Sequence, residues 1–259
     1  MKRFLKNTIL FSIIALALLT FPFGKATFAQ ENIKTPDVVL RKQLLKSVMG
    51  DSYTEINNLK NRLNKINIAD SDWKIIKEKL INDLAYFNDY YKDIESRIDS
   101  DPELSLEDIR SIANDLKDWR NSTYTPRLKE ITNFILVFEE ENLIKIANSR
   151  ADKITGDLAK FDKQGYIKTN DLKKLFAQAR KNLDNSQSSN NNAKELFLKS
   201  ITLSSATSTN EISATKTDTD KPSKDIQQNV QDLVKESIKY LKSAYETFFQ
   251  MNSQIKKFL

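Results

Sequence analysis

The sequence is 259 residues long, with a formal net charge of +6 and neither cysteine nor histidine. The absence of cysteine excludes disulfides and a lipid-modified cysteine anchor, and the absence of histidine removes the commonest general base and zinc ligand. Only four glycines occur, which leaves little material for phosphate-binding loops. We therefore expect a non-enzymatic protein without cofactor or metal, held together by apolar packing.

Residues 1–29 have the order of a secretory signal peptide. They begin with basic residues and no acidic one, continue with a short apolar run from Ile9 to Leu19, and end in Thr-Phe-Ala, with cleavage expected after Ala29. An uncleaved membrane anchor is the alternative, because Phe21 and Phe23 lengthen the apolar part. We expect export to a periplasmic, cell-surface or secreted location.

The basic charge owes much to this segment. Of the 41 basic residues, four lie in residues 1–29, which leaves 37 against 35 acidic residues, a net charge of +2. Nucleic-acid binding needs a concentrated basic face, so we expect no nucleic-acid partner. We expect instead a protein partner or self-association through amphipathic helices, with membrane contact only if residues 1–29 are retained.

The first two predicted helices form a hairpin around a short turn at residues 67–70. Apolar residues recur in steps of three and four along both, as in amphipathic helices. The first helix carries Val39, Leu45, Met49, Ile56, Leu59, Leu63 and Ile66, with a bend at Gly50. Ser71 is the expected cap of the second helix, which carries Trp73, Leu80, Leu84, Phe87, Tyr91, Ile94 and Ile98. A short connection favours antiparallel neighbours.

A third, shorter helix is predicted up to Trp119, because Ser105 and Asp108 have the spacing of a capping box. The longest apolar stripe runs from Thr125 to Phe161, where Thr125-Pro126 has the pattern of a helix start. Because the residue before a proline disfavours the α conformation, we expect a break or kink between these two helices.

The fifth helix starts near Asn170 after a turn at Gly165. Residues 184–192 have the composition of a loop, but the apolar spacing resumes in phase at Ala193 and Phe197, which favours a continuous helix. Residues 203–225 are rich in Ser and Thr and predict a disordered linker. The predicted organisation is a signal peptide (1–29), a helical bundle (30–202), the linker (203–225) and an amphipathic helix (226–259). The fold class is all-α, an elongated, coiled-coil-like antiparallel bundle of five to six helices.

Three motifs have a functional alternative. Residues 160–171 resemble an EF-hand loop, but Lys160 and Gln164 occupy ligand positions, so we expect a glycine-terminated helix hairpin. The acidic run of residues 139–141 is expected to form a solvated helix face. Tyr86 and Tyr90 lie beside the apolar stripe of the second helix, one turn apart. They indicate either a wider buried face or an exposed ridge that binds a glycan or peptide.

The run from Trp119 to Lys153, especially NFILVFEEENLIKIANSRADKI, resembles uncharacterised exported helical proteins of small-genome bacteria. The resemblance covers the central third of the chain and lies in packing positions, so it implies an exported helical fold and carries no site. The sequence thus predicts a structural or interaction protein of the cell envelope, with a glycan- or peptide-binding module as the alternative.

Overall fold

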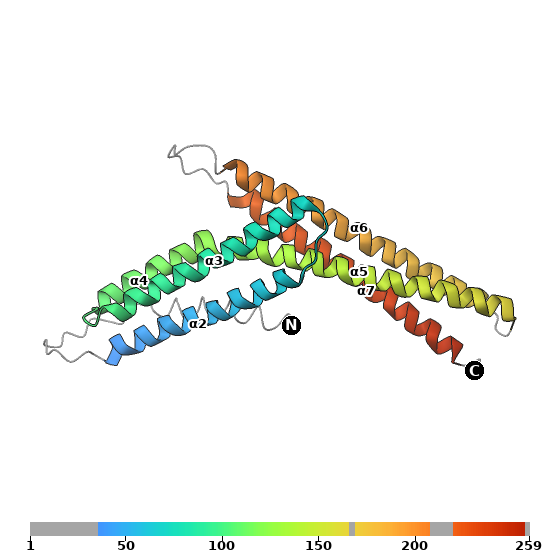
Figure 1. Ribbon diagram of the computed structural model, residues 1–259, viewed down its shortest axis with the longest axis horizontal. Helices are drawn as coiled ribbons and strands as arrows, with labels where there is room; N and C mark the ends of the chain where they lie inside the picture. The colour runs from blue at the N-terminus through green and yellow to red at the C-terminus, as the bar shows by residue number, and fades with distance from the viewer. Residues whose placement is uncertain (1–35, 166–168, 208–219, 257–259) are drawn as a thin grey trace. The chain divides into compact units, whose positions relative to one another are not determined.

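The computed structural model describes residues 36–165, 169–207 and 220–256, which form α-helices and one π-helical turn and contain no strand. The protein is an all-α helical bundle (Figure 1). The chain divides into two compact units between Ile131 and Thr132, inside helix α5 (Thr125–Gln164). The expected signal peptide and its cleavage site at Ala29 lie outside the described residues.

The first unit contains the predicted hairpin of α2 (Pro36–Lys65) and α3 (Ser71–Ser100), followed by α4 (Leu106–Trp119). The predicted apolar stripes form its interior and include the buried residues Leu45, Met49, Ile56, Leu63, Leu80, Leu84, Phe87, Tyr91 and Ile94. Val39 departs from the prediction, since it is 46% exposed in the first turns of α2. Helix α2 also runs without interruption through Gly50.

Asp70, one residue before the predicted cap, is the N-cap of α3. Its carboxylate Oδ1 accepts hydrogen bonds from the backbone N–H groups of Asp72 at 2.9 Å and Trp73 at 3.1 Å. The prediction of Ser71 as the cap is therefore wrong by one residue, since Ser71 is the first residue of the helix. The predicted capping box of α4 is confirmed: Ser105 Oγ accepts from the Asp108 N–H at 3.2 Å, and the Asp108 carboxylate accepts from the Ser105 N–H at 2.9 Å.

Replacing Asp70 with alanine is expected to lower the free energy of unfolding by about 1 kcal/mol, because two N–H groups of the first turn of α3 lose their acceptor. Urea denaturation followed by tryptophan fluorescence measures this change. Both tryptophans of the chain, Trp73 and Trp119, belong to the first unit. Ser71→Ala is the matched control and should leave the denaturation midpoint unchanged; equal effects of the two variants would contradict the assignment of the cap.

Helices α4 and α5 are joined by a single π-helical turn, η1 (Arg120–Tyr124), so the chain stays helical through Pro126. Of the expected break or kink, the break is therefore wrong. Thr125 has α-helical dihedral angles, and its N–H bonds to the carbonyl of Arg120, five residues back. The wider π turn gives the proline ring room beside the preceding turn, where an α-helix would place a carbonyl against it.

The second unit packs the remainder of α5 with α6 (Asn170–Thr207) and α7 (Asp220–Ile255). One apolar cluster contains Ala147, Ala151, Leu183, Leu241 and Ala244, and another contains Leu158, Leu172 and Met251. The alanines allow the helices to approach closely around the larger leucines. Helix α6 is continuous through residues 184–192, as the apolar spacing predicted. On α7, Ser237 is buried, whereas its neighbour Ile238 is 39% exposed.

The hairpin between α5 and α6 turns at Gly165, which has a positive φ of 66° that favours glycine. Its N–H bonds to the carbonyl of Phe161 at 3.1 Å, which closes the last turn of α5. At the other end of the unit, α6 continues to Thr207 and α7 begins at Asp220, so both helices extend into the predicted linker. Residues 208–219 lie outside the described ranges.

Candidate functional site

Tyr86 and Tyr90 lie one turn apart on α3, but their environments differ. Tyr86 is 56% exposed. Tyr90 is half-buried, because its ring stacks on the indole of Trp119 from α4 with 3.9 Å between ring centroids and 17° between ring planes. The structure thus adds Trp119 to the predicted tyrosine pair. We call Tyr86, Tyr90 and Trp119 the aromatic patch.

Buried rings hold the aromatic patch in place from below. Phe87 and Tyr91 meet Trp119 edge-to-face, with ring centroids 5.6 and 5.4 Å from the indole. Tyr124, from η1, packs against Phe87 with 5.1 Å between centroids. Edge-to-face contacts place the positive edge of one ring against the negative face of the next, so they fix ring orientation as well as burying area. The indole of Trp119 is therefore held rigidly at the surface of the unit.

A buried arginine lies behind these rings. Arg120 is only 6% exposed, and its guanidinium donates to the Ser52 hydroxyl at 2.6 Å and to the Tyr91 hydroxyl. The same guanidinium lies 4.8 Å from the ring centroid of Tyr124, within the range of a cation–π interaction. The first residue of the π turn thus ties α2 to α3 through a charged group that the sequence analysis did not identify.

A carboxylate balances this cation. Glu55 of α2 accepts a hydrogen bond from the Tyr124 hydroxyl at 2.9 Å. Burial raises the pKa of Glu55, while the bond from Tyr124 and the charge of Arg120 oppose that rise. Burial also raises the pKa of Tyr124 above its ordinary value. The tyrosine therefore stays protonated near neutral pH and acts as a hydrogen-bond donor, not as a general base.

A second tyrosine–carboxylate pair joins α2 to α3. The Tyr53 hydroxyl donates to the Glu95 carboxylate at 3.1 Å, and its ring meets Tyr91 edge-to-face with 5.9 Å between centroids. Burial, together with the bond to Glu95, raises the pKa of Tyr53 to about 12. The first unit thus holds two tyrosine–carboxylate hydrogen bonds beside one buried arginine, and such paired polar groups restrict side-chain motion.

Three charged residues act on Tyr90 of the aromatic patch. Burial raises the pKa of Tyr90, and the charges of Asp115 and Asp93 add to this rise, whereas Arg97 opposes it. Both aspartates and Arg97 are exposed. Within the described ranges, neither aspartate forms an ion pair. The patch therefore combines aromatic surface with two carboxylates against one nearby arginine.

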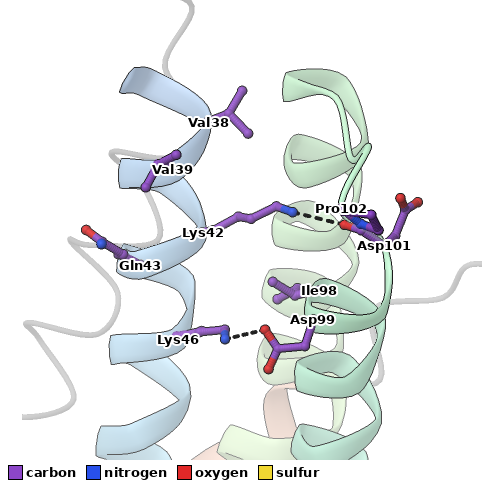
Figure 2. Close-up of a pocket in the computed structure, with 9 residues that line it drawn as sticks. All are labelled: Val38, Val39, Lys42, Gln43, Lys46, Ile98, Asp99, Asp101 and Pro102. Carbon is purple, nitrogen blue, oxygen red and sulfur yellow. Dashed lines mark hydrogen bonds and ion pairs between the residues drawn. The ribbon is translucent and has the colours of Figure 1, made fainter. Parts of the chain in front are cut away.

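A shallow pocket of about 260 Å³ lies between the first turns of α2 and the end of α3 (Figure 2). Lys42 reaches across it and donates to the backbone carbonyl of Asp101 at 3.1 Å, while Lys46 pairs with the carboxylate of Asp99. The two ammonium groups thus join the start of α2 to the last turn of α3 and to its C-cap residue Asp101. The remaining walls of the pocket are largely apolar.

In the second unit, Glu140 is buried, being only 2% exposed, which contradicts the expected solvated face of residues 139–141. Its Oε1 accepts a hydrogen bond from the Ser237 hydroxyl of α7 at 3.0 Å, and the Ser186 hydroxyl of α6 lies 2.9 Å from that of Ser237. Burial raises the pKa of Glu140, and the hydrogen bonds from Ser237 and Ser186 oppose this rise. Three helices therefore meet at one carboxylate.

Two asparagines, Asn133 and Asn190, are also buried in the interior of the second unit. The Asn133 amide donates to the backbone carbonyl of Gln227 at 3.0 Å, and Gln227 donates to the Ser200 hydroxyl at 3.1 Å. Asn190 is fully buried, one turn beyond Ser186, and neither its amide nitrogen nor its amide oxygen has a hydrogen-bond partner among the described residues. A buried amide without partners costs free energy.

Replacing Asn190 with leucine, which has the same branched shape and the same number of side-chain heavy atoms, is expected to raise the free energy of unfolding by about 1 kcal/mol, because the unpartnered polar group is removed from the interior. Circular dichroism during urea denaturation measures the change. Asn192→Leu, at an exposed position of the same helix, should change stability by less than about 0.5 kcal/mol. A destabilised Asn190→Leu protein would contradict the expected gain from removing the unpartnered amide.

The EF-hand-like segment forms a structural hairpin. Asp162 accepts a hydrogen bond from the Thr169 hydroxyl and pairs with the ammonium group of Lys173, so its carboxylate is engaged within the hairpin. In the part of the chain that the structure describes, no group of three or more acidic side chains lies close enough to hold a metal ion. The glycine-terminated turn predicted for this segment is confirmed.

The protein is an all-α protein with two units, each made of antiparallel helices. Both interiors contain hydrogen-bonded polar side chains, and the first unit carries the partly exposed aromatic patch. No protein-family model, curated protein or solved structure matches the chain. No helix within residues 36–165, 169–207 and 220–256 is long and apolar enough to cross a membrane.

Proposed function

We propose that the protein is an exported, non-enzymatic helical module of the cell envelope that binds a protein partner, or another copy of itself, through helix faces. The basic, apolar and small-residue order of residues 1–29 supports export. The arrangement of the described helices supports the interaction role. Apolar and hydrogen-bonded side chains fill the interiors of the two units, so the side chains that can contact a partner lie mainly on the outer faces of the helices.

Exposed apolar side chains on α5 carry this proposal. Leu143 and Ile146 are 48% and 41% exposed, and their spacing of three residues places them on one face of the helix. On α7, Ile238 and Phe249 are 39% and 69% exposed, about three turns apart and so on one face as well. Single exposed apolar residues are common on protein surfaces, but pairs aligned along a helix face are typical of helix–helix interfaces.

Sedimentation equilibrium of the chain from Gln30 onward tests the self-association form of the proposal. We expect a concentration-dependent oligomer that Leu143→Glu/Ile146→Glu dissociates. Ile75→Glu is the matched control, because Ile75 is equally apolar and 66% exposed on α3. If the chain is a monomer at every concentration, cross-linking in the intact cell envelope tests for a different partner, and cross-links unaffected by the double substitution would contradict the α5 face.

Export has its own measurement, independent of any partner. Expression of the whole chain in a bacterial host should give a mature protein outside the cytoplasm. Its intact mass should correspond to a chain that begins at Gln30. A cytoplasmic protein that retains Met1 would contradict export, and a membrane-bound protein of full mass would favour the uncleaved anchor.

The aromatic patch favours a second candidate function, an extracytoplasmic ligand-binding module. Tyr86 presents much of its ring to solvent, and the stacked pair of Tyr90 and Trp119 extends that surface across to α4. Tyrosine and tryptophan are enriched where proteins bind partners, because they combine a rigid apolar area with a polar edge.

A further inference from the structure

The aromatic patch spans two helices of the same unit and has a fixed shape. Tyr86 and Tyr90 lie on α3, and Trp119 is the last residue of α4. The buried rings of Phe87 and Tyr91 contact its indole edge-to-face. A rigid aromatic surface loses little conformational entropy when it binds a ligand. The patch is therefore prepared for binding before any ligand arrives.

The charges beside the patch restrict the kind of ligand that suits it. Asp93 lies three residues after Tyr90 on α3, and Asp115 lies four residues before Trp119 on α4, so both exposed carboxylates are neighbours of the stacked pair on the helix surfaces. Arg97 is a cation that opposes their effect at Tyr90. The nearby Asp83 is already paired with Arg127 at 2.6 Å. The faces of aromatic rings are electron-rich, so the rings and the two carboxylates attract the same sign of charge.

We propose that the aromatic patch binds the cationic side chain of a lysine or arginine presented by a partner polypeptide. A cation gains both the attraction of the ring faces and that of Asp93 and Asp115, whereas a neutral sugar ring gains stacking but no net Coulomb energy. The interior of the same unit holds Arg120 against the rings of Tyr91 and Tyr124, which shows the same pairing of guanidinium and tyrosine in this fold. The inference rests on the ligand-binding candidate function and names its ligand.

Fluorescence of Trp119 provides a direct measurement. In a Trp73→Phe background, the whole chain from Gln30 onward has this single tryptophan. The probes are capped hexa-arginine, capped hexa-glutamate and the neutral oligosaccharide chitotetraose. We expect saturable quenching by hexa-arginine alone, weakened by salt because the exposed charges are screened. Isothermal titration with the unsubstituted protein checks that the Trp73 substitution does not alter binding.

Three variants separate the contributions to binding. Asp93→Asn/Asp115→Asn keeps the shape of both side chains and should weaken binding of hexa-arginine about fivefold, with a smaller dependence on salt. Tyr86→Ala should weaken it about threefold. Asp51→Asn removes an exposed carboxylate from α2 and should leave the affinity unchanged. Far-ultraviolet circular dichroism confirms that each variant is folded.

The outcomes distinguish this inference from the functions proposed above. Absence of saturable binding by hexa-arginine, or binding that Tyr86→Ala and the double aspartate variant leave unaltered, would overturn it. Binding of chitotetraose in place of the cationic peptide would also overturn it while retaining a glycan-binding function for the patch. None of these results affects the α5 face, which the Leu143 and Ile146 substitutions test separately.

Discussion

Replacing Arg120 with methionine is expected to lower the free energy of unfolding of the first unit by about 3 kcal/mol. Methionine fills a similar volume but cannot donate to the hydroxyls of Ser52 and Tyr91, and it leaves the carboxylate of Glu55 without its cation. Urea denaturation followed by the fluorescence of the two tryptophans reports on this unit. The π turn should retain its backbone geometry, because the substitution changes only the side chain.

Two further variants test the reason for this loss. Glu55→Gln in the Arg120→Met background should recover part of the stability, since it removes the carboxylate that the first substitution leaves uncompensated. Arg97→Met, at an exposed position of α3, should change stability by less than about 0.5 kcal/mol. An Arg120→Met protein as stable as the original would show that apolar packing can replace the network without loss, and would contradict the role assigned to the arginine.

Replacing Glu140 with glutamine is expected to raise the free energy of unfolding by about 2 kcal/mol at pH 7, because the amide removes a buried negative charge and can still bond to Ser237. Burial raises the pKa of Glu140 in the folded protein above its ordinary value of 4.5, so the folded state binds a proton more tightly than the unfolded state. Stability of the original protein should therefore fall as pH rises through the folded pKa and level off above it.

The pH dependence provides the decisive comparison. Below about pH 4.5 the carboxyl is protonated in both states, so the difference between the original protein and Glu140→Gln should disappear. Amide hydrogen exchange of the peptides around Glu140, Ser186 and Ser237 measures the change within the second unit. Glu195→Gln, at an exposed position of α6, should show no such pH dependence. A less stable Glu140→Gln protein would show that the hydroxyl bonds outweigh the cost of burying the charge.

The sequence by itself determined the helices and most of the core. Steps of three and four between apolar residues require one face of a helix to leave water, so positions such as Leu80, Leu84 and Phe197 were predicted as buried and are buried. The same spacing predicted the continuous helix through the polar residues 184–192. Local chemistry was equally informative at Ser105 and at Gly165, where the hydrogen bonds and dihedral angles involve only neighbours in sequence.

Polar residues at positions of the apolar stripes are a sequence signal for buried polar side chains. Ser52 lies three residues after Met49 and four before Ile56, and Glu140 lies three after Val137 and four before Ile144. Both positions continue the stripe and therefore face the interior. The spacing indicates that such side chains are buried, but it cannot say which donors and acceptors from other helices will satisfy them.

Only the tertiary structure decided which polar groups meet. Arg120 reaches Ser52 and Tyr91 across three helices, and Glu140 meets Ser237 almost a hundred residues away, because the packing of the helices fixes the distances. The aromatic patch depends on packing in the same way, since Tyr90 stacks on Trp119 only where α3 and α4 lie side by side. Apolar burial is a property of one helix and its period, whereas a hydrogen bond or a ring contact requires two helices in one specific register.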